Sequence, residues 1–149
     1  MRGKAFFWWL WLVVVSAGVV RGGLVMVLAS GLTRRLFSLL VFASSETIGG
    51  FGALPARYVA LAHGVLGAVM VGWGVVLLFV VLGPFRRGSR EAWLTVAVSL
   101  AAWFVCDTIL SLATGFWQNA ALNVVVAILF AVPLGATWCA CDRRPEVLT

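Results

Sequence analysis

The side chains able to do chemistry gather in one otherwise apolar segment, Trp103–Asn123, which reads "WFVCDTILSLATGFWQNAALN". Asp107 could serve as a counter-ion or a proton acceptor, while Ser111, Asn119 and Asn123 could both donate and accept hydrogen bonds. An ionised carboxylate at the centre of a membrane-spanning helix costs about 2.5–3.5 kcal/mol. The aspartate therefore needs water, an opposite charge or a bound ligand beside it.

The composition places these residues in a membrane protein. Of the 149 residues, 63% are hydrophobic and only 11% are charged, whereas a soluble domain is about half apolar and about a quarter charged. The net charge of +6 would suggest nucleic acid in a soluble protein. Here the basic residues flank apolar stretches, so we interpret them as topology determinants and lipid-headgroup contacts, and expect no nucleic acid partner.

The membrane spans follow from hydrophobic length, because about 20 apolar residues cross the hydrocarbon core of a bilayer. We expect four spanning helices, at about residues 5–30, 57–83, 92–114 and 116–140. The join "TGFW" between the last two predicts a tight helical hairpin. The expected fold class is an all-α membrane protein, a four-transmembrane-helix bundle that forms a single membrane domain over residues 1–149.

A shorter segment separates the first two spans. Residues 32–44 are too few to cross a bilayer, and Arg34, Arg35 and Ser38 interrupt their apolar residues. This pattern is typical of a short helix lying at the membrane interface. Gly50, Gly52 and other turn-forming residues after it predict a loop that ends before the second span.

Positive charge predicts the orientation. If the N-terminus is cytoplasmic, the basic residues at the cytoplasmic ends outnumber those outside, and this bias favours both termini in the cytoplasm. The inner set is Arg2, Lys4, Arg86, Arg87, Arg90, Arg143 and Arg144, and the outer set is Arg34, Arg35 and Arg57. We expect an integral protein of a bacterial cytoplasmic membrane.

With this topology, polar residues from all four spans fall at one depth. Arg21 lies about 16 residues along the first span, which is about 24 Å at the rise of an α-helix, and Asp107 lies about 15 residues along the third span. His63 is about six residues, and Asn123 about seven, below the outer ends of helices running the opposite way. The sequence therefore predicts a polar layer in the outer leaflet.

Helical spacing supports this layer. Trp103, Asp107 and Ser111 recur every four residues, as do Asn119 and Asn123, so each set shares a helix face. His63 shares its face with Gly67 and Gly74, small residues that permit close helix contact. The predicted ligand-binding residues are Arg21, His63, Trp103, Asp107, Ser111, Asn119 and Asn123.

Three interpretations of the layer remain open. The layer could be structural, with Arg21 neutralising Asp107 and the amides fixing helix register. It could line a pocket for a lipid, quinone or similar amphiphile. It could also move protons or ions, but that needs protonatable groups through the whole membrane, and the inner half of the spans offers none.

Other chemistry finds less support in the residues. Cys139 and Cys141 form one incomplete C-x-C pair, which we interpret as reduced thiols, and Cys106 is too far from either to form a disulfide. A single histidine excludes bis-histidine haem ligation within one chain. No zinc, phosphate-loop or dinucleotide motif occurs. His63 and Asp107 lack an evident nucleophile, so an enzyme is not favoured.

The arginine–glycine pair "VVRGG", the short amphipathic segment, the glycine-rich "HGVLGAVMVGWG" and two further spans resemble the DoxX-like group of small four-helix bacterial integral membrane proteins. The resemblance covers nearly the whole chain in layout, although the third and fourth spans are more similar to uncharacterised bacterial proteins of this size. It implies a quinone or thiol redox partner. The chain departs from the thiol pattern because it has no paired outer cysteines.

These observations lead to two functional expectations. The first is a non-catalytic membrane protein whose outer-leaflet pocket binds a lipid, quinone or similar amphiphile. The alternative is an accessory subunit that packs against a larger membrane complex or a second copy of itself, its polar layer being structural. Bound small molecules would favour the first, and copurifying chains or a flat glycine- and alanine-rich face would favour the second.

Overall fold

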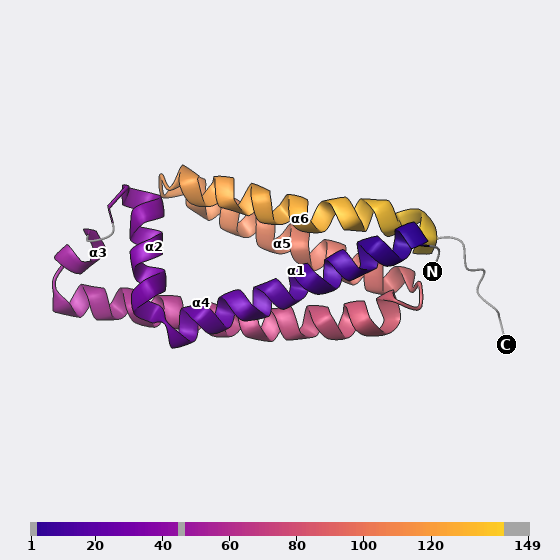
Figure 1. The fold of residues 1–149 in the computed structure, drawn as a ribbon. Helices are drawn as coiled ribbons and strands as arrows, with labels where there is room; N and C mark the ends of the chain where they lie inside the picture. The colour runs from indigo at the N-terminus through magenta and orange to yellow at the C-terminus, as the bar shows by residue number, and fades with distance from the viewer. Residues whose placement is uncertain (1–2, 45–46, 142–149) are drawn as a thin grey trace. The chain divides into compact units, whose positions relative to one another are not determined.

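The structure, a computed structural model, describes residues 3–44 and 47–141. Arg2, Arg143 and Arg144, which entered the topology argument, and the side chains of Cys139 and Cys141 lie outside the described part. Within the described part every regular element is helical, and short turns join the helices (Figure 1). Its elements are α1 (Gly3–Leu28), α2 (Ser30–Phe42), α3 (Thr47–Gly50), α4 (Ala53–Val80), the π-helical turn η1 (Val81–Phe85), α5 (Arg90–Ala113) and α6 (Trp117–Cys141).

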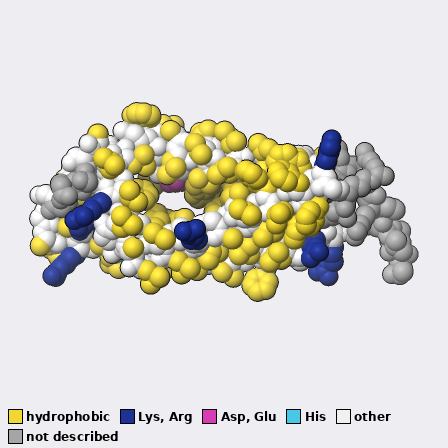
Figure 2. All heavy atoms as spheres, viewed as in Figure 1, with side chains coloured by type: hydrophobic (Ala, Val, Ile, Leu, Met, Phe, Trp, Pro, Cys, Tyr) yellow, Lys and Arg dark blue, Asp and Glu magenta, His cyan; other side chains and the backbone are white. Residues whose placement is uncertain are grey.

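Four of these helical stretches are long and apolar enough to cross a membrane: Gly3–Leu28, Ala53–Phe85, Arg90–Ala113 and Trp117–Trp138. The predicted fold class, an all-α four-span bundle with a short helix between the first two spans, is thereby confirmed. Hydrophobic side chains cover most of the visible face, and basic side chains occur in small groups (Figure 2). Such a surface suits helices that are solvated by lipid.

The start of the second span was predicted too late. We expected an irregular loop up to about residue 57, but Thr47–Gly50 forms a short helix and α4 already begins at Ala53. Pro55 therefore lies in the first turn of α4. Proline is tolerated there because the first amides of a helix have no intrahelical acceptor.

The short helix α2 is separated from α1 by Ala29, whose backbone leaves the helical region (φ −122°, ψ 48°). Figure 1 shows α2 running at a steep angle to α4. At its other end Ala43 adopts a left-handed conformation (φ 54°), and the buried Ser38 hydroxyl donates to the Ser44 carbonyl at 2.5 Å. The helix thus ends at a fixed turn. Its position at a membrane interface remains a prediction.

The chain divides into two compact units, each of which is described separately. Unit 1 comprises Met1–Ser16 and Val76–Thr149, and unit 2 comprises Ala17–Val75. Helices α1 and α4 each run from one unit into the other. The expectation of a single membrane domain stays a prediction.

Unit 2 is held together by glycines where α1 meets α4. A Cβ atom added to Gly23 would lie 2.5 Å from the Gly67 carbonyl oxygen, and one added to Gly67 would lie 2.7 Å from the Gly23 oxygen. A Cβ on Gly74 would lie 2.7 Å from the Val20 side chain. The two backbones therefore touch, as small residues in membrane helices allow. The sequence predicted close contact at Gly67 and Gly74, but not its partner.

Unit 1 contains the antiparallel α5–α6 hairpin, joined by a turn at Gly115 (φ +82°), as the "TGFW" join predicted. Tryptophan side chains connect its segments. The Trp9 indole N–H donates to the Val81 carbonyl at 2.8 Å, and the Trp93 indole N–H donates to the Leu134 carbonyl at 2.8 Å. Leu12, Val81 and Val96 are completely buried around them.

A third tryptophan compensates for a proline. Pro133 lies inside α6 and has no N–H, so the carbonyl of Leu129, four residues earlier, loses its α-helical donor. The Trp11 indole N–H donates to that carbonyl at 3.1 Å. A backbone group without water at this depth needs such a partner. The bond explains how a buried proline is accommodated in a spanning helix.

Candidate functional site

The strongest polar cluster lies in the α5–α6 hairpin of unit 1. The Asn119 side-chain amide donates to the Ser111 hydroxyl at 2.8 Å and to the Asp107 carboxylate at 3.3 Å. Ser111 in turn donates to the backbone carbonyl of Asp107 at 2.6 Å. One asparagine on α6 thus contacts two successive turns of α5. The sequence had placed Asp107 and Ser111 on one helix face and included all three residues in the predicted ligand-binding set.

Asn123 lies one helical turn further along α6 and is buried. Its amide donates to the Thr108 hydroxyl at 3.4 Å, a long bond. Sequence reasoning missed Thr108, because a threonine inside a helix usually bonds its own backbone and gives no signal of a cross-helix contact. Trp103 is half-buried on α5, one turn from Asp107.

The Asp107 carboxylate is the least satisfied group of the cluster. The residue is half-buried, and among the described residues only the Asn119 amide donates to its side chain. A neutral amide at 3.3 Å is a weak partner for a charge in a membrane span, where each charge is costly. The arrangement leaves the carboxylate open to a further donor or to a cation.

In unit 2, His63 is half-buried on α4 and is fixed by two contacts. Its Nδ1 lies 2.8 Å from the Val59 carbonyl oxygen, and its ring meets the Phe37 ring of α2 edge to face, with centroids 4.9 Å apart. A carbonyl can only accept, so Nδ1 carries the proton in this arrangement. Nε2 is left for a second partner. No pattern in the sequence pairs Phe37 with His63.

The space beside His63 is limited on the Gly67 side of α4. The α1 backbone lies against Gly67, in keeping with the close helix contact predicted at that glycine. Gly64 has no atom within 4 Å of an added Cβ. Only the Gly64 side of the helix is open.

Arg21 is exposed on α1 within unit 2. The only acidic residue in the sequence of unit 2, Glu46, lies outside the described residues. Asp107, the partner predicted for Arg21, belongs to unit 1, and the relative positions of the parts of the chain are not determined. The Arg21–Asp107 pair, and the convergence of His63 with the hairpin cluster, therefore stay predictions.

Chemically, the two groups of residues suit recognition better than bond making. The hairpin offers a carboxylate, a hydroxyl and amides, and α4 offers an imidazole with one free ring nitrogen. Ser111 donates its proton to the Asp107 backbone instead of to a base, so no activated nucleophile is present in the described cluster. The groups could hold a hydroxyl, a carbonyl or a cation.

Comparison of the chain with protein-family models, with curated proteins and with solved structures finds no match.

Proposed function

We propose that this chain is a small multi-pass protein of a bacterial cytoplasmic membrane, with both termini in the cytoplasm, that binds a lipid, quinone or similar amphiphile. The proposed pocket opens in the outer leaflet. Its residues are Arg21, His63, Trp103, Asp107, Ser111, Asn119 and Asn123.

One observation carries this proposal: the Asp107 carboxylate has a single weak donor among the described residues. Burying a charge costs free energy unless a partner compensates for it. A ligand hydroxyl, ammonium group or quinol would supply that partner. Arg21 is the partner that the chain itself could supply, and the two could grip a headgroup together.

His63 supports the same proposal from α4. Because Nδ1 is committed to the Val59 carbonyl, Nε2 accepts when the ring is neutral and can bind a hydroxyl. The resemblance to the DoxX-like group favours a quinone among the amphiphiles. A thiol partner has less support because paired outer cysteines are missing from the sequence.

Native mass spectrometry of the gently extracted full-length protein tests the proposal. We expect bound amphiphile in the wild-type protein, with lower occupancy in His63→Ala and Asp107→Asn. Val65→Ala, on an exposed face of α4, and Glu91→Gln, in the first turn of α5, are the matched controls. The proposal fails if no small molecule is retained, or if His63→Ala lowers the melting temperature without changing the bound species.

The proposed orientation has its own measurement. In a background with the native cysteines replaced by serine, a cysteine at Lys4 should resist a membrane-impermeant label in intact cells, and a cysteine at Arg57 should react. Both residues are exposed. Labelling of the Lys4 position from outside would overturn the topology.

A second candidate function, an accessory subunit, is favoured by one face of α4. Gly64, Ala68 and Gly72 recur every four residues, and nothing lies within 4 Å of a Cβ added to either glycine. Such a stripe suits a partner helix. This function would be favoured over the first by two results together. Gly72→Leu should remove a copurifying chain, and His63→Ala should leave the bound small molecules unchanged.

A further inference from the structure

The hydrogen-bonding groups left over in the Asp107–Ser111–Asn119 cluster are acceptors. The Asn119 amide has two N–H groups, and it donates one to the Ser111 hydroxyl and one to the Asp107 Oδ2 atom. The single Ser111 hydroxyl proton goes to the Asp107 backbone carbonyl. A carboxylate can only accept, so the amide nitrogen of Asn119, not its oxygen, faces it. Asp107 Oδ1 and the Asn119 amide oxygen receive no donor from the described residues.

These two free acceptors select the headgroup of a ligand. A quinone carbonyl or a phosphate oxygen only accepts, and a hydroxyl has one proton to give, whereas a protonated primary amine has three N–H donors and a positive charge. Hydrogen bonds to an ionised partner are about twice as strong as neutral ones. Within the described part of unit 1 the Asp107 carboxylate has no cationic partner. An ammonium group therefore complements the cluster in both charge and hydrogen bonding.

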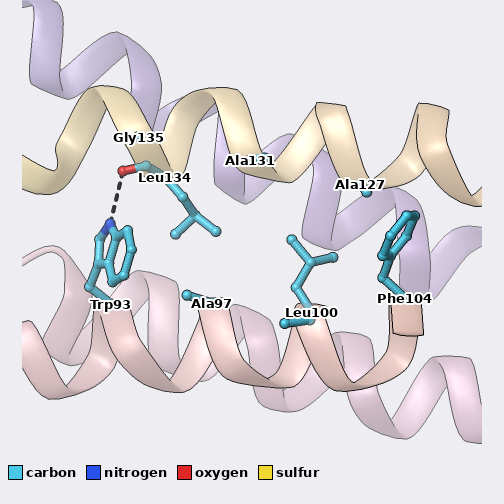
Figure 3. Close-up of a pocket in the computed structure, with 9 residues that line it drawn as sticks. Trp93, Ala97, Leu100, Phe104, Ala127, Ala131, Leu134 and Gly135 are labelled. Carbon is cyan, nitrogen blue, oxygen red and sulfur yellow. Dashed lines mark hydrogen bonds between the residues drawn. The ribbon is translucent and has the colours of Figure 1, made fainter. Parts of the chain in front are cut away.

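An apolar groove between α5 and α6 continues the seam that holds the cluster (Figure 3). On both helices the lining residues and the cluster residues follow one another at spacings of three or four, so they share one face of each helix. The series on α5 is Ala97, Leu100, Phe104, Asp107 and Ser111, and on α6 it is Gly135, Ala131, Ala127, Asn123 and Asn119. The hairpin thus offers a polar end and an apolar groove in line.

The groove has the dimensions of one hydrocarbon chain. Its volume is about 340 Å³, within the range of ligand sites. Figure 3 shows Trp93 at one end, fixed by its bond to the Leu134 carbonyl, and Phe104 at the other. Trp93 and Phe104 are 11 residues apart, which is about 16 Å along a helix and about half of a hydrocarbon core. Asp107 comes one turn after Phe104.

The two ends of the groove differ in charge. At the Trp93 end, Trp93 meets Trp138 edge to face and Arg90 lies over the Trp138 ring. The segment 86–90 carries three arginines, against the single acid Glu91 that follows it. At the Phe104 end the charged side chain is Asp107. A positive headgroup is therefore attracted to the Asp107 end and repelled from the other.

We propose that the α5–α6 hairpin binds a single-chain amphiphile with a primary ammonium headgroup. The ammonium donates to the Asp107 carboxylate and to the Asn119 amide oxygen, and the hydrocarbon chain lies in the groove toward Trp93. The site is the hairpin part of the pocket proposed above, so this ligand class rests on that proposed function. A phosphate-bearing headgroup is disfavoured because Asp107 would repel it.

Native mass spectrometry of the full-length protein in phosphatidylcholine nanodiscs, titrated with tetradecylamine or tetradecanol, tests the headgroup. The two compounds share one chain length, so a difference in retention reports the ammonium group. We expect tetradecylamine to be preferred, and Asp107→Asn to lower its apparent affinity about tenfold. Asparagine keeps the shape of aspartate and an acceptor for the Asn119 amide. Glu91→Gln, an equal loss of charge on an exposed residue of α5, should leave the affinity unchanged.

A second pair of variants tests the groove. Ala131→Phe should fill it and reduce retention of both compounds, whereas Ala102→Phe, also exposed on its helix but outside the lining, should not. Ala97→Leu repeats the test with a smaller side chain if Ala131→Phe elutes as an aggregate.

The outcomes distinguish the ligand class from the function on which it rests. Equal retention of the amine and the alcohol, with both lowered by Ala131→Phe, would overturn the ammonium headgroup and leave an amphiphile pocket in place. An affinity for tetradecylamine that falls in Glu91→Gln instead of Asp107→Asn would also overturn it. Displacement of tetradecylamine by an equal amount of phosphatidylethanolamine would overturn the single-chain ligand. Retention of neither compound, with no small molecule on the extracted protein, would overturn the pocket itself.

Discussion

The two units join their helices by opposite means. In unit 2 the α1 and α4 backbones touch through Gly23 and Gly67, with no side chain between them. In unit 1 the contacts are made by large or polar side chains, such as Trp9 on Val81 and Asn119 on Asp107. Backbone contact leaves no freedom to adjust, whereas a side chain can rotate. The comparison predicts that unit 2 is less tolerant of substitution.

The largest effect should come from a single methyl group in unit 2. Gly67→Ala would place a Cβ 2.7 Å from both the Gly23 oxygen and the Met26 Cβ, neither of which can rotate away. Overpacking of this kind costs about 1–3 kcal/mol. Denaturant titration in detergent micelles, followed by circular dichroism, would measure the loss.

The control for this prediction is Gly72→Ala, because nothing lies within 4 Å of a Cβ at that position. Alanine is the better helix former, so this variant should be neutral or more stable by up to about 1 kcal/mol. Equal losses in the two variants would show that α1 and α4 do not touch through Gly67.

A smaller effect is expected from the Asn119 side-chain amide in unit 1. Asn119→Leu removes both the Ser111 and the Asp107 contact and should cost about 1 kcal/mol, within the range measured for polar contacts between membrane helices. Asn123→Leu, which loses one bond of 3.4 Å, should cost about half as much. The same titration ranks the two. A greater loss in Asn123→Leu would contradict the geometry of the hairpin.

The smallest effect is expected from the Trp11 indole, which donates to the carbonyl that Pro133 leaves without a backbone donor. Trp11→Phe removes the donor to the Leu129 carbonyl and should cost about 0.5 kcal/mol. In a Pro133→Ala background the alanine N–H supplies the donor that proline lacks, so Trp11→Phe should then have less effect. A double-mutant cycle measures the difference. Additive losses would mean that the indole and the proline are not linked.

The parts of the fold that could be predicted from the sequence depend on length and local chemistry. Hydrophobic length alone located the four spans, and the "TGFW" join gave the hairpin whose turn is at Gly115. The spacing also placed Asp107 and Ser111 on one helix face, but it did not predict that Asn119 contacts both of them. These inferences work because a helix converts residue number into depth and direction.

What could not be predicted depends on tertiary partners. Trp9, Trp11 and Trp93 each donate to a carbonyl in another segment, and no local pattern in the sequence pairs an indole with a particular carbonyl. Only Pro133 offered a signal, since a proline inside a span releases a carbonyl that needs a donor. The partner of Gly67 was likewise invisible, because a glycine in the sequence does not reveal which backbone approaches it.

The π-helical turn η1 has a consequence for insertions and deletions. Proline at position 84 has no N–H for the carbonyl four residues earlier, and the chain widens there by one residue per turn. Deleting one residue within Val81–Phe85 can convert this turn to an ordinary α-helical one, with little change in the helix before it. A deletion between Pro55 and His63 would instead rotate those two segments of α4 by about 100° relative to each other. If Gly67 kept its contact with α1 and His63 kept its contact with Phe37, the first turns of α4 would have to take up the whole rotation. Homologous chains of different length should therefore differ within η1 before they differ within α4.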